Sequence, residues 1–318
     1  MTERLILDCD PGHDDAMAIM LAAAHPGLEL LAITTVAGNQ TLAKVTRNAL
    51  AVCTIAGIHD VPVAAGAEGP LTRRQVVAPD IHGDTGLDGP VLPDPTVELD
   101  PRNAVDLIVQ TVMSEPTGTV TLVPVGPLTN IALALQAEPE IARRVKRVSL
   151  MGGAYTRGNS TPAAEFNIYA DPEAAAQVFD AGWPITMVGL DLTHQALADE
   201  AVFERLQAVE GPLGEFVVAM LRFFQSTYAT SQGFTYPPVH DPCAVAALLD
   251  GIVGTERARV DVETQGRFTS GMTVVDFEAF RTVQHEGTPM NCDVATTIDV
   301  RKFWDVMIDA VTTLGSRP

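Results

Sequence analysis

The sequence predicts an α/β protein with an open, mostly parallel (mixed), Rossmann-like sheet and helices on both faces of that sheet. Two observations carry this prediction. Short apolar runs alternate with helical patterns along most of the chain, and this β-α-β-α order is typical of a parallel sheet. The composition is 47% hydrophobic but only 5% aromatic, which suits Ala- and Leu-rich helices packed on a buried sheet.

The predicted strands are short apolar runs, each ending in Asp or Gly. They are residues 4–10, 28–38, 61–66, 118–126, 145–153 and 183–191. The segments between them repeat apolar residues at helical spacing. These predicted helices are residues 14–25, 41–57, 101–114, 128–144 and 171–182. Ligands of open α/β sheets bind at the carboxyl ends of the strands, so we expect the functional residues in the loops that follow the strands.

The C-terminal part of the sequence is more helical. Residues 200–233 predict two helices, and residues 241–251 predict another that begins with Asp-Pro. Apolar and polar residues alternate in residues 257–300, which predicts a small excursion of antiparallel strands. Residues 301–314 predict an amphipathic helix. No linker, repeat or low-complexity stretch interrupts the chain, so we expect a single domain over residues 1–318.

Charge and cysteine content limit the possible partners and the cellular compartment. Lys and Arg number 20 against 40 Asp and Glu, and a net charge of −20 repels nucleic-acid phosphates and acidic membranes. We therefore expect no nucleic-acid or membrane partner, and no apolar run is long enough to span a bilayer. The first strand begins so early that no signal peptide is expected. The four cysteines match no zinc pattern and predict a reduced, cytoplasmic protein.

The most informative stretch is LILDCDPGHDDAMAIMLAAAH, which contains Asp8, Asp10, Asp14 and Asp15. Carboxylates this close repel one another, and burying one without a partner is costly. A helix N-cap and a solvated turn account for one or two of them. They do not account for three that converge on one strand end. An oxygen-rich cluster of this kind suits a hard cation such as Ca²⁺ or Mg²⁺.

Two families begin with a similar pattern. Haloacid-dehalogenase-type phosphatases also open with an apolar strand and DxD, and there Asp8 would be the nucleophile and Asp10 the acid. That pattern wants Thr or Val two residues after the second Asp, whereas this chain has Gly12. The chain also has no persuasive downstream lysine. The competing pattern is DxDPGxDDAxA, and further motifs support it.

The chain resembles the inosine-uridine-preferring nucleoside hydrolase family in six further motifs, in order along residues 4 to roughly 250. They are VAGN (36–39), HGDTGLDG (82–89), PVGPLTNIALAL (124–135), MGG (151–153), GNSTPAAEFNIYADPEAA (158–175) and VHDPCAVA (239–246). The resemblance implies the nucleoside hydrolase fold. It also implies Ca²⁺-dependent hydrolysis of the N-glycosidic bond of ribonucleosides, which gives ribose and a free base through an oxocarbenium-like sugar.

The resemblance also implies residue roles. The Ca²⁺ ligands would be Asp10, Asp15, Asp241 and the Val125 carbonyl oxygen. Asp10 would also be the general base, and His240 is the candidate acid for the leaving base. The substrate-binding residues would be Asp14, Asn39, His82, Met151, Asn159, Glu165, Phe166, Asn167, Tyr228 and Asp241. Asp8 would be structural or would support these residues.

Several of these segments also have a purely structural interpretation. GPLTN suits a strand-to-helix turn, and Asp241 suits a helix N-cap with His240 in the preceding loop. Residues 159–167 suit a polar loop. Phe224, Tyr228 and Gln232 recur at four-residue spacing, which suits core packing. Alternatively, that helix face lies over the leaving base of a purine-tolerant enzyme.

We therefore predict a ribonucleoside hydrolase that tolerates purine and pyrimidine bases (inosine and uridine). One alternative is a pyrimidine-specific ribonucleoside hydrolase. Others are a Mg²⁺-dependent haloacid-dehalogenase-like phosphohydrolase and a non-catalytic nucleoside-binding protein. The expected partners are small ribonucleosides and further copies of the chain in a dimer or tetramer. The expected role is ribonucleoside catabolism or purine and pyrimidine salvage.

Overall fold

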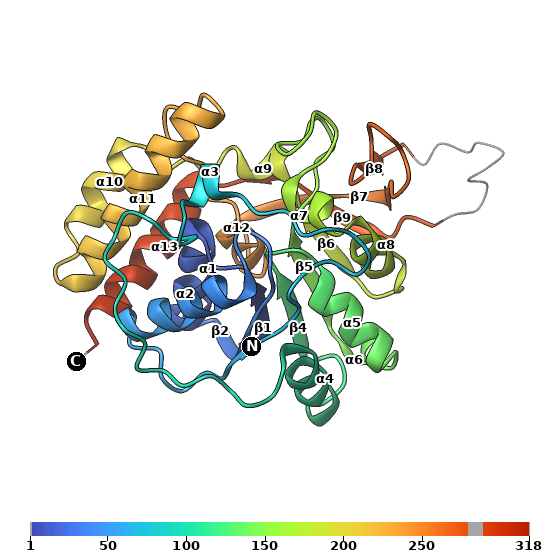
Figure 1. Ribbon diagram of the computed structural model, residues 1–318, viewed down its shortest axis with the longest axis horizontal. Coiled ribbons are helices and arrows are strands. Elements are labelled where there is room, and N and C mark those ends of the chain that lie inside the picture. Colours follow the sequence, from blue (N-terminus) through green and yellow to red (C-terminus); the bar gives the residue numbers. More distant parts are fainter. Residues whose placement is uncertain (1, 279–288, 318) are drawn as a thin grey trace.

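A nine-stranded sheet forms the centre of the protein (Figure 1). The computed structural model describes residues 2–278 and 289–317. Across the sheet, the strands run in the order β3-β2-β1-β4-β5-β6-β9-β7-β8. In chain order they are β1 (Glu3–Cys9), β2 (Leu28–Thr35), β3 (Val63–Ala65), β4 (Val120–Pro124), β5 (Arg147–Met151), β6 (Ile185–Val188), β7 (Val253–Val262), β8 (Thr273–Asp276) and β9 (Cys292–Ile298).

Helices cover both faces of this sheet. They are α1 (His13–Ala24), α2 (Leu42–Ile55), α3 (Pro79–His82), α4 (Ala104–Ser114), α5 (Thr129–Ala137), α6 (Ile141–Arg144), α7 (Phe166–Ala170), α8 (Pro172–Asp180), α9 (Leu190–Thr193), α10 (Glu200–Gln207), α11 (Pro212–Ser231), α12 (Pro242–Ala246) and α13 (Val300–Gly315). Helices α1, α2 and α10 to α13 lie on one side, and α4, α5, α6 and α8 lie on the other (Figure 1).

The alternation of side chains along β1 shows how the sheet separates two cores. Leu5 and Leu7 pack into the core beneath α1 and α13, whereas Ile6 between them packs into the core beneath α4 and α5. All three side chains are fully buried. A strand buried on both faces must be apolar along its whole length, which is why β1 reads as a continuous apolar run.

The sheet reverses its strand order beside β1. From β1 the chain adds β2 and β3 on one side, and it then crosses to add β4 on the other. Asp8 on β1 pairs with Pro124 on β4, so the residues after both strands emerge side by side. In open α/β sheets this position forms a crevice for ligands. The topology therefore places Asp10 next to the Val125–Gly126 turn.

The predicted α/β class with a mixed sheet is confirmed, but one predicted helix is not continuous. Residues 128–144 form α5 and α6, separated by Glu138 to Glu140. Pro139 lacks an N–H and disfavours helical geometry at the residue before it, and Glu138 has φ −143° and ψ 88°. The helix within 241–251 is also shorter, because it ends at Ala246. The short helices α3, α7 and α9 were not predicted.

The antiparallel excursion near the C-terminus extends the main sheet. β9 runs parallel to β6, and β7 then pairs antiparallel with both β9 and β8. Residues 279–288 of the predicted excursion lie outside the described residues. All four cysteines are free and buried. Among the described residues, no helix has the length and apolar character needed to cross a bilayer.

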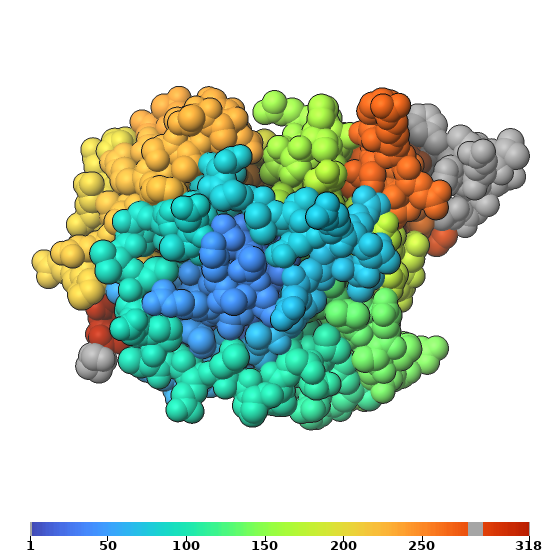
Figure 2. Space-filling model, viewed as in Figure 1, coloured from blue at the N-terminus to red at the C-terminus, as the bar shows by residue number. Residues whose placement is uncertain are grey.

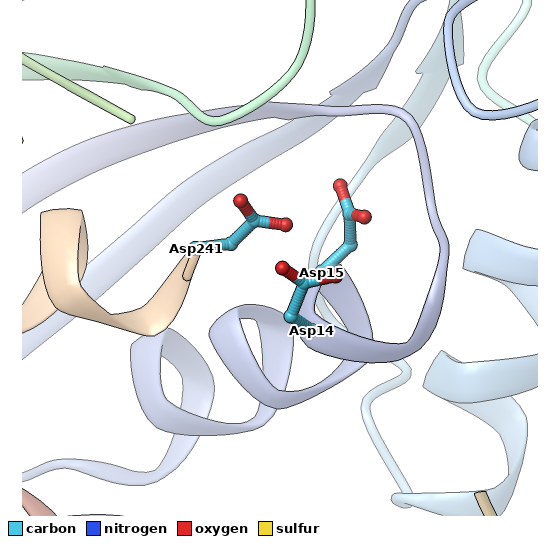
Figure 3. Close-up of side chains that lie close together, drawn as sticks. All are labelled: Asp14, Asp15 and Asp241. Carbon is cyan, nitrogen blue, oxygen red and sulfur yellow. The ribbon is translucent and has the colours of Figure 1, made fainter. Parts of the chain in front are cut away.

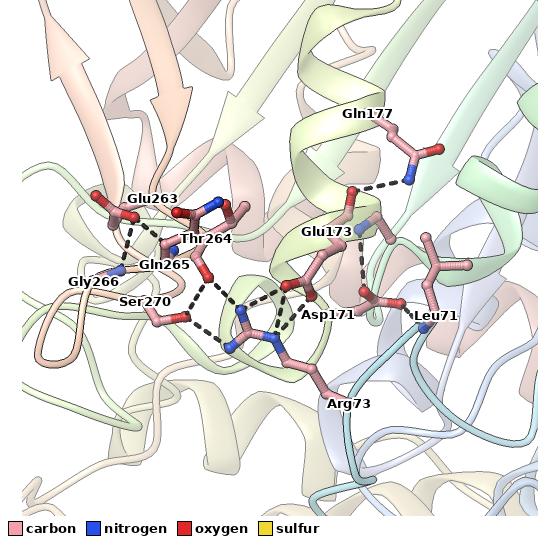
Figure 4. Close-up of polar contacts among 11 residues, drawn as sticks. Leu71, Arg73, Asp171, Glu173, Gln177, Glu263, Thr264, Gln265, Gly266 and Ser270 are labelled. Carbon is pink, nitrogen blue, oxygen red and sulfur yellow. Dashed lines mark hydrogen bonds and ion pairs between the residues drawn. The ribbon is translucent and has the colours of Figure 1, made fainter.

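The long connection from β3 to α4 lies across one face of the molecule (Figure 2). It carries α3, and Arg73 anchors the stretch before α3 (Figure 4). The Arg73 guanidinium binds the Glu173 carboxylate at 2.7–3.1 Å and donates to Ser270 Oγ at 2.7 Å. Asp171 Oδ2 accepts from the Leu71 N–H at 2.8 Å. These contacts fix the path of the chain towards α3, which borders the site described below.

Candidate active site

The turn between β1 and α1 is held together by one of its own carboxylates. Asp15 accepts hydrogen bonds from the Asp10 N–H and the Gly12 N–H, both at 2.9 Å. Asp14 and Asp15 occupy the first turn of α1, where free N–H groups and the helix dipole favour negative charge. The turn therefore folds in a way that gathers carboxylates.

Three carboxylates meet above this turn (Figure 3). Oxygen atoms of Asp14, Asp15 and Asp241 all lie within 4.8 Å of one another, and the three residues are buried. Asp241 is brought in from the start of α12, and the His240 N–H donates to Asp14 Oδ2 at 3.3 Å. Burial and the neighbouring Asp15 raise the pKa of Asp14 to about 8. The carboxylates are thus arranged at an energetic cost.

Asp10 lies beside this group and is incompletely satisfied. Its Oδ2 accepts from the Asn39 N–H at 2.6 Å, but its buried Oδ1 has no hydrogen-bond partner among the described residues. A Cβ on Gly38 or Gly126 would lie within 2.1–2.5 Å of the Asp10 carboxylate oxygens, so both positions need glycine. Burial and the charge of Asp15 raise the pKa of Asp10. An unpaired buried oxygen beside three carboxylates fits a hard divalent cation.

The Val125 carbonyl faces the same region. The Val125 N–H donates to the Asp8 carbonyl oxygen at 2.8 Å, which continues the β1–β4 pairing by one residue. Asn167 Nδ2 donates to the carbonyl oxygens of Val125 at 2.7 Å and Met151 at 3.1 Å. Both amide hydrogens of Asn167 are therefore used, and its Oδ1 is left to accept a hydrogen bond from a ligand.

Glu165 and Asn159 form a second polar wall. The Glu165 carboxylate caps α7, accepting from the Asn167 and Ile168 N–H groups at 2.8 and 3.1 Å, and it also accepts from the Gly153 N–H. Burial raises the Glu165 pKa to about 7 in spite of these bonds. Asn159 Oδ1 accepts from the Phe166 N–H at 2.9 Å. Its amide group remains a donor, so this wall offers both donors and acceptors to hydroxyl groups.

A cavity of about 120 Å³ connects these groups. Every predicted substrate-binding residue lines it, as do Val125 and His240. The further lining residues are Ala78, Ile81, Ser160 and Gln232. Asp10 and Asp15 do not line the cavity, but Asp15 belongs to the carboxylate cluster with Asp14 and Asp241, which do. Within the described part of the chain, the lining contains no Lys or Arg, so the cavity suits an uncharged polar ligand better than a phosphate.

His240 is held between two hydroxyl groups. Its Nδ1 lies 2.7 Å from Thr193 Oγ1, and its Nε2 lies 2.7 Å from Tyr228 Oη. Burial lowers the pKa of His240 well below its ordinary value, so the ring is neutral at pH 7. Sequence reasoning did not find Thr193, which belongs to no motif. Tyr228 also lines the cavity, so the bond from His240 to Tyr228 leads to the cavity.

Phe224 does not line the cavity, whereas Tyr228 and Gln232 on the same helix face do. Phe224 is fully buried, and its ring packs against His13, His82 and Tyr228. Phe224 therefore supports the rings of the wall, as the core-packing interpretation predicted. His13 was not identified from the sequence. Its place between Gly12 and Asp14 in the aspartate motif was the available signal.

Asp8 is sealed from the cavity. It is fully buried, and its Oδ1 accepts from Thr34 Oγ1 at 2.6 Å and Asn130 Nδ2 at 2.7 Å. Burial raises its pKa to about 7. The phosphohydrolase alternative requires Asp8 to attack a substrate, and this position does not support that role. The expectation that Asp8 is structural agrees with its contacts.

Comparison with known proteins relates this geometry to a family. A family model described as inosine-uridine preferring nucleoside hydrolase matches residues 5–305. The chain is 51% identical to the inosine-uridine preferring nucleoside hydrolase of Leishmania major, over 99% of each chain. It is 47% identical to the pyrimidine-specific ribonucleoside hydrolase RihA of Shewanella sp. (strain MR-7), covering 98% of this chain and 96% of the relative.

A solved structure agrees with these matches. The purine-preferring ribonucleoside hydrolase from Gardnerella vaginalis superimposes with a TM-score of 0.91 at 34% identity, covering 98% of this chain and 99% of the other. Both the sequence and the fold therefore match over almost the entire length. The chain belongs to the inosine-uridine preferring nucleoside hydrolase family and is a ribonucleoside hydrolase.

Proposed function

We propose that this ribonucleoside hydrolase is Ca²⁺-dependent and releases the base from both purine and pyrimidine ribonucleosides. One observation carries the proposal. A cluster of buried carboxylates adjoins a cavity lined by amides and carboxylates. Asp14 and Asp241 belong to both, and Asp10 Oδ1 beside them has no partner among the described residues. Oxygen-only ligands of this kind favour Ca²⁺ over softer metals.

The cation would be held by Asp10, Asp15, Asp241 and the Val125 carbonyl oxygen. Asp14 belongs to the same cluster and would support the site from the cavity side. When bound, the cation supplies positive charge that favours deprotonation of water and orders sugar hydroxyl groups. The pKa values of these carboxyls are raised, so ionised carboxylates are disfavoured in the protein alone. A bound cation favours the ionised form and would offset this cost, which supports the assignment.

The chain's own groups divide the remaining tasks. Asp10 is the general base for the attacking water, since Asn39 fixes its orientation through the 2.6 Å hydrogen bond. Asp14 and Asp241 accept from the 2′- and 3′-hydroxyls at the floor of the cavity. Asn167 accepts through the oxygen that its two carbonyl contacts leave free. Rejection of sugars that lack these hydroxyls follows, because the buried polar groups would then be unpaired.

Asn159 and Glu165, which form the second polar wall, bind the rest of the ribose. Met151 and Phe166 line the cavity around the ribose. On the other side, His240, Tyr228 and His82 form the wall that faces the base. His240 is the proposed acid for the leaving base, and its hydrogen bond to Tyr228 provides the link to the cavity. Proton donation by His240 would use its imidazolium form, because the N–H of a neutral imidazole donates hydrogen bonds but is a very weak acid.

The base preference is proposed from the apolar and aromatic lining. Ile81 and Tyr228 offer apolar or flat surfaces that do not depend on the size of the base. The named relatives include inosine-uridine preferring, pyrimidine-specific and purine-preferring enzymes. A pyrimidine-specific hydrolase is the second candidate, because the Shewanella enzyme is 47% identical over nearly the whole chain.

We also propose that residues 1–318 form one domain, since the sheet draws strands from Glu3 to Ile298. The free buried cysteines support a reduced, cytoplasmic setting. We propose assembly into a dimer or tetramer and a role in ribonucleoside catabolism or base salvage, which follows from the products ribose and free base.

A substrate panel tests this function. Purified enzyme with Ca²⁺ is incubated with inosine, guanosine, adenosine, uridine and cytidine, and free base and reducing sugar are measured. We expect release from both inosine and uridine and little from 2′-deoxyinosine, which controls for the hydroxyl contacts. Activity on pyrimidines alone would establish the second candidate. Activity on p-nitrophenyl phosphate without base release would contradict both.

A further inference from the structure

His13 lies directly behind His82, the histidine of α3 that lines the cavity. The two Nδ1 atoms are 3.1 Å apart, and His13 Nε2 lies 2.9 Å from the Asp88 carbonyl oxygen. The rings are stacked with centroids 5.3 Å apart, and His13 also stacks on Phe223 and Phe224. His13 itself does not line the cavity, so it can influence a substrate only through His82.

The contacts of His13 determine where the protons lie. A carbonyl oxygen only accepts, so the 2.9 Å contact with Asp88 requires a hydrogen on His13 Nε2. A neutral His13 then has a bare Nδ1. The 3.1 Å contact between the two Nδ1 atoms is attractive only if His82 Nδ1 carries the hydrogen. His82 Nε2 is therefore bare.

The competing arrangement of protons is less favourable. The His13 backbone N–H points at His82 Nδ1, but at 3.4 Å this is the longest of the three contacts. Satisfying it instead would bring two lone pairs together at 2.9 or 3.1 Å. A positively charged His13 would satisfy all three contacts, but the ring is fully buried among other rings. An unpaired charge buried in this way is costly, so the neutral pair prevails.

The orientation of His82 directs its bare nitrogen into the cavity. A Cβ on Gly12 would lie 2.4 Å from His82 Nδ1 and 2.6 Å from Cε1, so this edge of the ring rests on the turn before α1. The opposite edge, which carries Nε2, is the one available to the cavity. Gly12 is thus required, because any side chain there would displace His82.

We propose that His13 is a positioning residue that fixes His82 as its Nδ1–H tautomer, so that His82 Nε2 accepts a hydrogen bond from an N–H group of the substrate's base. The proposal rests on the proposed nucleoside substrate and on the wall of His82, Tyr228 and His240 facing the base. It assigns opposite roles to the two cavity histidines. His82 accepts and cannot protonate the leaving base in this tautomer, whereas His240 remains the candidate donor.

Two variants of His13 separate this role from ring packing. His13→Asn places an amide oxygen close to the position of Nδ1 and keeps an acceptor for His82, but it removes the ring. His13→Phe keeps the stack on Phe223 and Phe224 but removes the acceptor. A residue that matters only for packing would tolerate Phe better than Asn, and a residue that sets the tautomer would tolerate Asn better than Phe.

The tautomer is measured without substrate. Enzyme labelled with ¹⁵N-histidine gives ring ¹⁵N shifts at pH 7, and His82→Gln identifies the His82 signals by their loss. We expect a protonated Nδ1 and a bare Nε2 at His82 in the wild type and in His13→Asn, and a shift towards Nε2–H in His13→Phe. A wild-type His82 with a hydrogen on Nε2 overturns the proposal, even if neither variant folds.

Kinetics provide the second measurement. With His13→Phe we expect kcat/KM for inosine and uridine to fall about tenfold, the effect of one hydrogen bond. For p-nitrophenyl β-D-ribofuranoside, whose leaving group has no N–H, the fold-decrease in kcat/KM should be at least about five times smaller than for inosine and uridine. His13→Asn should lose less than His13→Phe. Equal losses on both kinds of substrate, or a greater loss in His13→Asn, overturn the proposal. Inactive wild-type enzyme would instead refute the proposed function.

Discussion

The two ends of β1 carry acidic residues in opposite electrostatic situations. At the amino end, Glu3 is 8% exposed, and its carboxylate contacts Lys146 Nζ at 2.5 Å and an Arg147 nitrogen at 3.2 Å. Thr121 Oγ1 adds a hydrogen bond at 2.5 Å. Burial opposes ionisation of Glu3, but the bonds from Lys146 and Thr121 and the charge of Arg147 outweigh it and lower its pKa.

At the carboxyl end of β1, the described residues supply no such cation. Asp10, Asp14, Asp15 and Asp241 take part in none of the ion pairs of the described chain, and burial raises their pKa values. The protein neutralises the buried Glu3 carboxylate with cationic side chains and could neutralise other buried carboxylates in the same way. We therefore attribute the carboxylates without a cationic partner at the carboxyl end, the unsatisfied end of β1, to the function of the protein. The contrast teaches that the amino end is complete as a protein structure, whereas the carboxyl end is completed by a ligand.

The largest expected effect comes from removing a charge at the unsatisfied end. Asp10→Asn should lower kcat by about 10²–10⁴-fold with little change in KM, because the proposed general base is lost. Steady-state kinetics on inosine measures this. Asp8→Asn is the matched control on the same strand, since Asp8 is sealed from the cavity. Near-normal kcat in Asp10→Asn together with loss of kcat in Asp8→Asn would contradict the assigned roles.

The next effect concerns the leaving base. His240→Ala should lower kcat on inosine by about 10²-fold, because the base departs poorly without a proton. The loss should be much smaller on p-nitrophenyl riboside, whose leaving group needs no proton. Comparing the two substrates separates proton donation from positioning. Equal losses would make His240 a binding or structural residue, and Tyr228 would become the better candidate acid.

The metal-free carboxylates should destabilise the protein as they ionise. The pKa of Asp14 is raised to about 8 in the folded state, so between about pH 4 and pH 8 the folded state binds more protons than the unfolded one. This group therefore makes stability fall as pH rises through that window. Ca²⁺ at about 100 times its Kd should add about 2.7 kcal/mol to the free energy of unfolding.

Urea unfolding at pH 5 and pH 8, with and without Ca²⁺, measures this pH effect. The stabilisation by Ca²⁺ should be larger at pH 8, because binding requires deprotonated carboxyls. Subtracting the unfolding free energies measured without Ca²⁺ from those measured with Ca²⁺ removes the pH dependence contributed by groups far from the site. A stabilisation that is larger at pH 5, or absent at both pH values, would show that the cluster does not bind the ion.

The smallest effect on activity is expected at the satisfied end. Glu3→Gln should lower the free energy of unfolding by about 1–3 kcal/mol, because Lys146 and Arg147 lose a charged partner. It should leave kcat unchanged, since Glu3 is at the opposite end of β1. The contribution of Glu3 should be present above its ordinary pKa and be lost as pH falls through the lowered one. A change in kcat comparable to that of Asp10→Asn would erase the contrast between the two ends.

Much of the site could be predicted because its residues follow strands. Asp10, Val125 and Met151 come at or directly after the ends of β1, β4 and β5, and parallel strands bring those ends together. The same reasoning could not show that Asp14 lines the cavity whereas Asp10 does not. Both are carboxylates of one turn, and only the path of the backbone from Pro11 to Asp15 distinguishes them.

Pairs of residues from distant segments were beyond the sequence. His13 meets His82 from 69 residues away, and Thr193 meets His240 from 47 residues away. No periodicity or local motif in the sequence indicates either contact. The break between α5 and α6 is different, because Pro139 is a local signal that the helical pattern around it obscured.

One measurement tests most directly the claim that a cation completes the carboxyl end of the sheet. Enzyme treated with chelator and freed of it is assayed for hypoxanthine released from inosine while Ca²⁺ is added back, with Mg²⁺ and Zn²⁺ in parallel. The account predicts that activity is lost on chelation and returns saturably with Ca²⁺. Full activity after chelation, or activity restored by Zn²⁺ alone, would contradict it.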